Sequence, residues 1–187
     1  MINKNFKAIV ALLLQNGNSL AGKALIPIKK PTNGNTTYLF NWMDGTSRFP
    51  YKSDNTMRFN SSYNAAGVYI GSGATLPTED DYALENMITS GISATSPATT
   101  SGVDASGNPY YTMVWTLTNT TAADITINEV GYIQSFNYSD TQGSTSASGG
   151  YFLIDRTVLD STLLVPANGI AVLKYTLKTI VNTPSVS

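Results

Sequence analysis

The side chains that most often carry chemistry in proteins are unevenly represented in this chain of 187 residues. It contains no histidine and no cysteine, which excludes disulfides, thiolate nucleophiles, the usual zinc ligands and imidazole acid–base catalysis. The redox compartment therefore cannot be inferred. Glu129 and Asp155 suit glycoside hydrolysis only if they lie about 5–9 Å apart, and the sequence gives no reason to place them so. We interpret Asp155, Arg156 and Asp160 as a surface ion pair and expect no catalytic residue and no enzyme.

A run of three consecutive carboxylates is the next candidate for chemistry: Glu79, Asp80 and Asp81. Carboxylate oxygens are good calcium ligands, but Thr78 followed three residues later by Asp81 resembles a capping box, and acidic residues stabilise a helix N-terminus. The pattern favours capping and predicts a short helix over 79–85, while calcium binding stays an open alternative. Gly71-x-Gly73 lacks the rest of a nucleotide-binding motif and indicates a tight turn, so we expect no cofactor. Because capping is favoured over calcium at 79–81, no metal ligand is assigned either.

Aromatic side chains offer a different kind of site. Tyrosine rings stack on sugar faces without any need for charge. The segment from 137 to 150 is rich in Ser, Gly and Thr, which predicts a mobile loop, and Tyr138 and Tyr151 lie at its two ends. These two tyrosines are the candidate exposed binding tip of a carbohydrate-binding or receptor-binding module.

The composition limits the class of partner. Charged residues make up 12% of the chain, about half of the usual share, so the exposed surface must be largely uncharged. Such surfaces suit secreted chains, adhesins and subunits of virions or pili, where neighbouring copies cover hydroxyl-rich and aromatic faces without burying charge. The formal net charge of −1 argues against nucleic acid as the main partner.

The N-terminal third carries the candidate assembly residues. An amphipathic helix is predicted over 1–16, with apolar residues at helical spacing, and it either packs on its own sandwich or docks into a neighbouring copy. The apolar run from 8 to 14 is at the minimum for a signal-peptide core and far below the ~20 residues that span a bilayer. A long loop over 43–62 supplies further aromatic side chains. The candidate assembly interface is Phe6, Ile9, Val10, Leu13, Leu14, Phe49, Tyr51 and Phe59.

The rest of the chain has the pattern of β-strands. Residues 110–118 alternate large apolar with small, mostly polar side chains, which places one set on each face of a strand; Trp115 belongs to the predicted core. Shorter strands are predicted at 24–28, 36–42 and 68–71, with Pro27 indicating an edge strand. We predict a mainly β fold, an antiparallel β-sandwich of jelly-roll or Ig-like type over 63–187, preceded by an N-terminal helical arm and assembly segment over 1–62.

Several local features of this sandwich are predicted as well. An extended polar strand covers 89–100, and 104–109 closes a hairpin. A bulge is expected near Gly131. The segment 155–160 is expected to bend across the fold, and 166–169 to turn the chain into a last strand over 170–181, with Lys174, Thr176 and Lys178 pointing outward.

Four stretches together resemble small structural proteins of tailed bacteriophages. They are Gly-Ser-Gly-Ala…Pro-Thr-x-Asp-Asp-Tyr-x-Leu-Glu (71–85), Thr-x-Thr-Asn-Thr-Thr (116–121), Ile-Thr-Ile-Asn-Glu-Val-Gly (125–131) and Asp-Arg-Thr-Val-Leu-Asp…Val-Pro-Ala-Asn-Gly…Tyr-Thr-Leu (155–177). The resemblance covers about 68–181 and consists of turns and strand edges. It implies an antiparallel β-sandwich assembled in many copies on a head, neck or tail, and it carries over no ligand or active-site residue.

These observations predict a structural protein of a bacteriophage virion, either capsid-associated (a decoration protein) or in the neck or tail. Its expected location is the virion, assembled in the host cytoplasm. Its expected partners are copies of itself and other virion proteins, with no nucleic acid and no membrane. The alternative is the receptor-binding or carbohydrate-binding head of a fibre or adhesin, with host surface glycans as partners.

Overall fold

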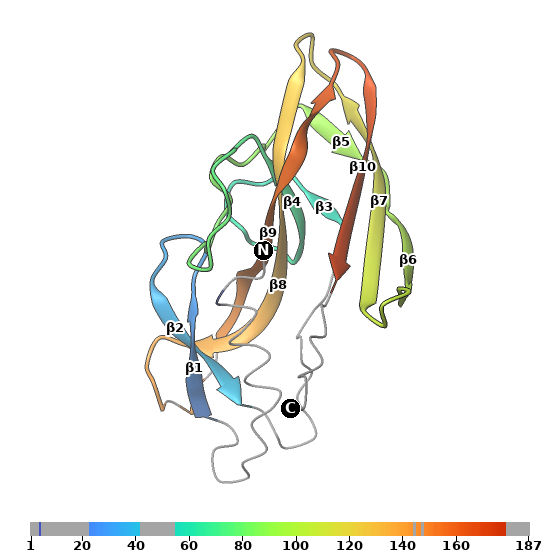
Figure 1. The fold of residues 1–187 in the computed structure, drawn as a ribbon. Coiled ribbons are helices and arrows are strands. Elements are labelled where there is room, and N and C mark those ends of the chain that lie inside the picture. The colour runs from blue at the N-terminus through green and yellow to red at the C-terminus, as the bar shows by residue number, and fades with distance from the viewer. Residues whose placement is uncertain (1–3, 5–22, 42–54, 144, 147, 179–187) are drawn as a thin grey trace. The chain divides into compact units, whose positions relative to one another are not determined.

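The computed structural model describes Lys4 and residues 23–41, 55–143, 145–146 and 148–178, and these residues are mainly β. They form ten strands in two sheets (Figure 1). The mainly β prediction is confirmed. The predicted N-terminal helical arm lies outside the described residues, apart from Lys4.

The chain divides into two compact units. Unit 1 consists of Met1–Ser90 and Thr126–Thr162, and unit 2 of Gly91–Ile125 and Leu163–Ser187. The boundary between 62 and 63 that the sequence suggests stays a prediction, because most of residues 1–54 lies outside the described part.

The sheet of unit 1 has the strand order β1-β2-β8-β4-β3, with β9 also paired to β8. Its strands are β1 (Lys23–Lys29), β2 (Thr36–Asn41), β3 (Met57–Arg58), β4 (Gly67–Gly71), β8 (Ile125–Ser139) and β9 (Ser148–Val165). β1 lies at the edge, as its proline predicts. The pair β3 and β4 is parallel, whereas β1–β2, β2–β8 and β4–β8 are antiparallel.

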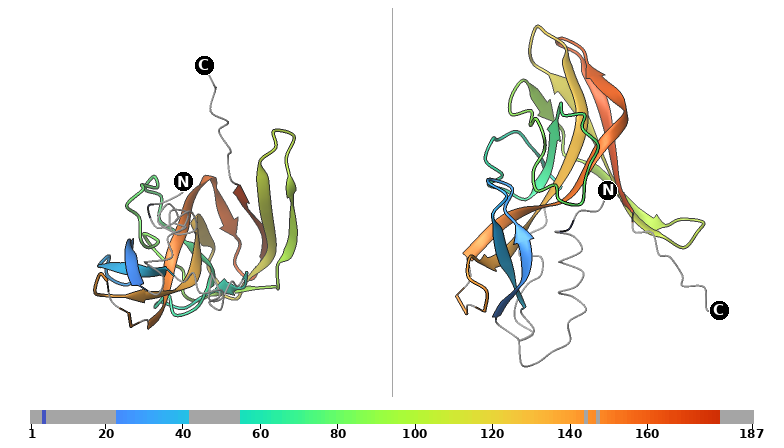
Figure 2. Two further views of the ribbon diagram at one scale, coloured as in Figure 1. Left: turned by 90° about the horizontal axis from the view of Figure 1, so that it is seen from below. Right: turned by 60° about the vertical axis from the view of Figure 1, so that its left-hand side comes forward.

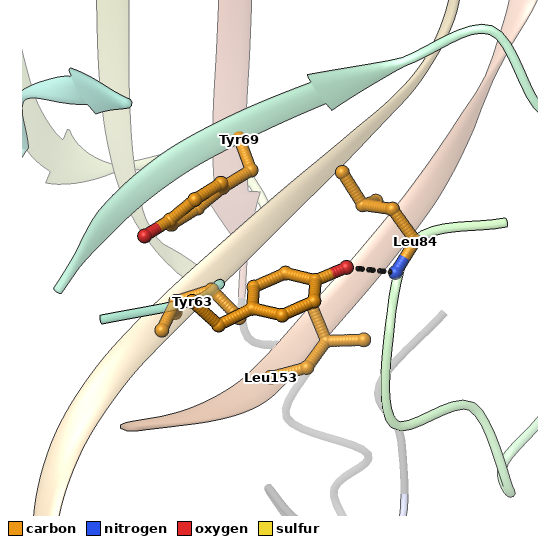
Figure 3. Close-up of a cluster of buried hydrophobic side chains, with 5 residues drawn as sticks. Tyr63, Tyr69, Leu84 and Leu153 are labelled. Carbon is orange, nitrogen blue, oxygen red and sulfur yellow. Dashed lines mark hydrogen bonds between the residues drawn. The ribbon is translucent and has the colours of Figure 1, made fainter. Parts of the chain in front are cut away.

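A cluster of apolar side chains forms the part of the unit 1 core shown in Figure 3. It consists of Tyr63, Tyr69, Leu84, Ile133 and Leu153, each less than a tenth exposed. The backbone of Tyr63 has a φ of 44°, which is unfavourable for an aromatic residue. Its hydroxyl accepts a hydrogen bond of 2.7 Å from the backbone N–H of Leu84, and burial raises its pKa to about 12. The strained backbone thus places a buried acceptor beneath the segment that contains Leu84.

The sheet of unit 2 is built around β7 (Pro109–Asn119). β10 (Ile170–Lys178) pairs with one side of it, and β5 (Ile92–Ala94) and β6 (Ala98–Val103) pair with the other side, all antiparallel. Figure 2 shows β7 between β10 and β6. The predicted alternation is confirmed, since Met113, Trp115 and Leu117 are fully buried.

Three turns of unit 2 form as their residues require, two of them at the predicted segments 104–109 and 166–169. The Asp104 carboxylate accepts the N–H groups of Ser106 and Asn108, each at 2.9 Å, and closes the β6–β7 hairpin. The Asn119 side chain donates to the carbonyls of Ala123 and Val165 and accepts from Thr121. The turn over 166–169 has Asn168 at a φ of 53°.

The short helix predicted over 79–85 is wrong, because that segment consists of turns and bends. The capping hydrogen bond does form, from the Thr78 N–H to the Asp81 carboxylate at 3.1 Å. The N–H groups of Glu85 and Asn86, however, donate to the Glu129 carboxylate. A long-range acceptor therefore takes donors that a helix would have used.

Four other local predictions need correction. Residues 89–100 do not form one strand: β5 ends at Ala94 and β6 begins at Ala98, with Pro97 in the break. No bulge forms near Gly131 in the pairing of β4 with β8, which runs there without a shift in register. Residues 155–160 do not form a separate crossing segment between two strands, because β9 runs through them. The loop expected over 137–150 is shorter, since β8 continues to Ser139 and β9 begins at Ser148.

Candidate functional site

Two charged residues from the sequence analysis, Glu129 and Arg156, meet inside unit 1. The Arg156 Nε donates to Glu129 Oε2 at 2.7 Å, and the two remaining guanidinium nitrogens contact Asp81 at 2.8 Å and Glu85 at 3.4 Å. We call these four residues the Arg156 cluster. Only 3% of Arg156 is exposed, so the expectation of a surface ion pair at 155–160 is wrong.

Glu129 is the centre of the Arg156 cluster. It is completely buried, and its carboxylate accepts backbone N–H bonds from Gly73 at 3.2 Å, Glu85 at 3.1 Å and Asn86 at 2.8 Å. A Cβ atom on Gly71 or Gly73 would lie 2.4 or 2.6 Å from Glu129 Oε1. The two glycines therefore let the backbone come close enough to surround a buried carboxylate, which accounts for the Gly71-x-Gly73 pattern without any nucleotide.

The electrostatics of the Arg156 cluster lower the pKa values of two of its carboxyl groups, those of Asp81 and Glu85. Burial on its own raises the pKa of Asp81, but hydrogen bonds from Arg156 and Thr78 outweigh it and hold that pKa below its usual range. Hydrogen bonds from Thr75 lower the pKa of Glu85. Neighbours within the protein thus favour the charged forms of Asp81, Glu85 and Arg156. The role of the cluster is to fix the segment 72–86 on strands β8 and β9.

Asp155 does not join Glu129 as a pair of carboxylates. Successive residues of a strand point to opposite faces, and Arg156 occupies the face on which Glu129 lies. Asp155 instead accepts a hydrogen bond of 3.0 Å from the Thr157 hydroxyl. The geometry thus gives no support to the two-carboxylate arrangement of a glycosidase.

The run Glu79-Asp80-Asp81 does not converge on one point. Asp80 pairs with Lys4 at 2.8 Å and with Lys29 at 3.6 Å, whereas Asp81 belongs to the Arg156 cluster. Within the described ranges, no group of three or more acidic or other metal-ligating side chains is placed to hold an ion.

The two tyrosines of the predicted binding tip lie in separate environments. Tyr138 packs edge-to-face on Phe152, with ring centroids 5.5 Å apart, and the Lys30 ammonium lies 4.5 Å from its ring centre. A Cβ atom on Gly150 would lie only 2.6 Å from the Tyr138 ring, so the backbone of that glycine covers it too. Tyr151 packs against the core cluster of Figure 3. Both side chains are half-buried.

Most of the predicted assembly interface cannot be placed. Phe59 is described and is half-buried just after β3. The other members lie outside the described residues: Phe6, Ile9, Val10, Leu13, Leu14, Phe49 and Tyr51. Their role in assembly stays a prediction.

The outer face of the unit 2 sheet carries two features that the sequence analysis did not single out. At one end of β10, Ile170 and Val172 are 64% and 59% exposed. Both lie on the face of Lys174, opposite the buried Leu173. The signal was present in the sequence, because 170 and 172 alternate in register with Lys174, Thr176 and Lys178, which were correctly predicted to point outward.

At the other end of the same sheet face lies a groove of about 490 Å³. β6, β7 and β10 all contribute to its lining. Thr112, which is only 6% exposed, lies in it and shares a hydrogen bond of 2.9 Å with Thr176 across the two strands. Tyr110 is packed over Gly102, where a Cβ atom would lie 3.0 Å from the tyrosine hydroxyl.

The charges of this groove are partly compensated. The Lys178 ammonium bonds the Asp104 carboxylate, and this bond, together with the N–H of Asn108, lowers the Asp104 pKa to about 2. Lys174 is exposed, and the described part of the chain offers its ammonium no hydrogen-bond or ion-pair partner. The groove therefore carries one uncompensated positive charge.

The described residues contain no helix with the length and hydropathy that crossing a bilayer requires. In comparisons with known proteins, no protein-family model, no curated protein and no solved structure matches this chain.

Proposed function

We propose that this chain is a structural protein of a bacteriophage virion, present in many copies and joined to its neighbours through uncharged β surfaces. The share of charged residues, 12%, supports this, because interfaces between subunits are depleted in charge at their centres. The four stretches that resemble small structural proteins of tailed bacteriophages support the virion in particular.

The observation that carries the proposal is the exposed apolar part of β10. This strand is at the edge of its sheet and has β7 as its partner among the described strands. An edge strand offers unpaired backbone groups to another chain, and soluble monomers usually protect such edges. Here the edge instead presents two β-branched side chains, Ile170 and Val172, to the exterior. Strand addition or face-to-face packing by a second copy covers both.

The energy of such a contact suits assembly in many copies. Burying a Val or Ile side chain completely contributes about 1.5–3 kcal/mol, and Ile170 and Val172 each have more than half of their surface left to bury. Each contact then gains roughly 2–4 kcal/mol from the two side chains. One such contact is weak in solution. In a closed ring or lattice each copy makes several contacts at once, so their energies together hold the assembly.

For the fold, we propose that the two sheets belong to an antiparallel β-sandwich. The support is the amount of apolar side chain that is fully buried on both sheets, including Trp115 and Leu117 on one and Val130 and Leu153 on the other. Burying one face of each sheet is what a sandwich core achieves. An experimental structure in which the two sheets pack on other partners would contradict it.

The assembly proposal is tested by placing charge on β10. Ile170→Lys and Val172→Lys should shift the purified chain from many-copy species to monomer in mass photometry and sedimentation velocity. Leu76→Lys is the matched control, because Leu76 is 77% exposed and lies in unit 1. A wild-type chain that remains monomeric at 100 µM in these assays, or one whose assembly is unchanged by both β10 variants, contradicts the proposed interface.

The virion itself is tested separately. If the gene lies in a phage genome, mass spectrometry of purified particles should find the chain at a fixed ratio to the major capsid protein. Its absence from particles that contain every other structural protein would contradict the virion assignment, whatever the state of the isolated chain.

A further inference from the structure

We propose that the groove on the outer face of the unit 2 sheet is a binding site for an acidic saccharide, a short sugar chain that carries a carboxylate. The groove lies at the Asp104–Lys178 end of the sheet, away from the apolar part of β10. The proposal therefore goes beyond the assembly function and does not depend on it.

The first argument is the form of the site. Its volume of about 490 Å³ is within the range of small-molecule sites. Strands supply most of its lining, including Thr100 on β6, Tyr110 and Thr112 on β7, and Thr176 on β10. Cross-strand pairing sets Thr112 opposite both Thr100 and Thr176. Positions held by three paired strands are fixed before any ligand arrives, which lowers the entropic cost of binding.

The second argument is the chemistry of the lining. Threonine offers a methyl group and a hydroxyl together, and a tyrosine ring offers an apolar face with a polar edge. A sugar has the same mixture of C–H surface and hydroxyl groups. Thr112 and Thr176 already share one hydrogen bond, but each hydroxyl keeps further capacity as donor or acceptor. This lining suits a hydroxyl-rich ligand that lies flat on the sheet.

The third argument is charge. Asp104 is neutralised by Lys178 and by backbone N–H groups, so it does not compete for the neighbouring cation. Lys174 is the cation that remains, exposed and without a partner among the described residues. A carboxylate on the ligand would accept a charge-assisted hydrogen bond from the Lys174 ammonium and neutralise it.

A saccharide also fits better than the other acidic ligands. A phosphate or a strongly acidic peptide is normally bound by several cations or by guanidinium groups, whereas this groove has one uncompensated ammonium group and no arginine in its lining. The surrounding hydroxyls recognise hydroxyls rather than further charge. The sugar site proposed here is therefore the unit 2 groove, whereas the sequence suggested the loop at Tyr138 and Tyr151.

The test is calorimetry and amide NMR on the full chain with tri-galacturonic acid as the probe. Its methyl ester is the matched ligand, because it has the same sugar skeleton without the charge. We expect the acid to bind, to shift the amide signals of Thr112, Lys174 and Thr176, and to bind about tenfold or more tightly than the ester, as the loss of one charge-assisted hydrogen bond implies.

Two variants locate the site. Lys174→Met should weaken binding of the acid about tenfold and leave the ester unchanged, and Thr176→Val should weaken both ligands by about two- to tenfold. Lys30→Met is the control, because it removes the same charge at a residue of unit 1, and it should bind the acid like the wild type. Circular dichroism confirms that each variant is folded.

Several outcomes of these measurements would contradict the saccharide site. No binding of the acid at 10 mM, equal binding of acid and ester, or signal changes away from the groove would overturn the proposal. Tri-glutamate or inorganic phosphate that binds as tightly as the sugar acid would do the same, since the site would then recognise an anion without recognising a saccharide.

Discussion

The Arg156 cluster allows a prediction whose size follows from the structure. Replacing Arg156 by Met keeps most of the side-chain volume but removes three contacts, at 2.7 Å to Glu129, 2.8 Å to Asp81 and 3.4 Å to Glu85. The loss of the Arg156 contact destabilises the three carboxylates to different degrees. The side chain of Glu85 is 44% exposed and that of Asp81 is 18% exposed, so water replaces part of what they lose, whereas Glu129 is completely buried.

The free energy of unfolding should therefore fall mainly because Glu129 is left as a buried charge without its cation. Removing one member of a buried ion pair typically costs about 3–5 kcal/mol. The exposed Glu85 contact adds at most about 1 kcal/mol. In the double variant Glu129→Gln with Arg156→Met, the stranded charge is absent. Its loss of stability should then be smaller than the sum of the two single losses, by about 1–3 kcal/mol.

Urea unfolding followed by tryptophan fluorescence and circular dichroism measures these differences, with Asp160→Asn as the control. Asp160 lies on β9 but is exposed, so its variant should change stability by less than about 0.5 kcal/mol. Amide hydrogen exchange adds a local measurement, since Gly73, Glu85 and Asn86 should lose protection first. A loss below about 1 kcal/mol for Arg156→Met, or strict additivity in the double variant, would refute the view that this ion network fixes the 72–86 segment.

Three further predictions test other parts of the fold. The pKa of Asp104 is lowered to about 2, so its contribution to stability is present above the ordinary value of 3.8 and is lost as the pH falls toward 2; acid titration of Asp104→Asn should show a shallower loss over this range than the wild type. Tyr63→Phe should cost about 1–2 kcal/mol in urea unfolding, because the buried N–H of Leu84 loses its acceptor. Gly71→Ala should cost about 1–3 kcal/mol in the same assay, because the new methyl group would meet the Glu129 carboxylate.

Each of these has an outcome that contradicts it. Identical acid titrations for Asp104→Asn and the wild type would mean that the carboxylate has the same pKa in the folded and unfolded chain. An unchanged midpoint for Tyr63→Phe would mean that the N–H of Leu84 finds water. Full stability of Gly71→Ala would mean that the backbone around Glu129 has room to move.

The parts of the fold that the sequence predicted are those governed by neighbours along the chain. The alternation through Trp115 needs only a strand with one buried face, and the turn at Asp104 needs only a side chain that bonds its own backbone. The edge position of β1 was predicted from Pro27 alone, because a proline has no backbone N–H to donate to a second neighbouring strand. These signals lie within about ten residues, so no knowledge of the rest of the chain is required.

The errors have the opposite origin. The capping signal at Thr78 and Asp81 is real, but the helix it predicted fails because Glu129, more than forty positions away in the sequence, captures the N–H groups of the segment. Arg156 looked like a surface residue because its neighbours in sequence are acidic, whereas its partners come from two other parts of the chain. Sequence spacing carries no sign of such contacts, since they depend on which strands pair and in what register.

The same contrast explains why the candidate functional surfaces lie where they do. The chain has 11 basic and 12 acidic residues, and the Arg156 cluster uses four of these 23 inside unit 1. Surface charge favours solubility. Two of the four, Arg156 and Glu129, are buried, so they contribute no charge to a surface that has few charges to begin with. The unit 2 sheet carries two different surfaces on one face. One is formed by Ile170 and Val172, which a neighbouring copy can cover without desolvating any charge, and the other is the groove that contains the uncompensated Lys174 ammonium. The proposed assembly contact and the proposed ligand site thus use different residues of one sheet.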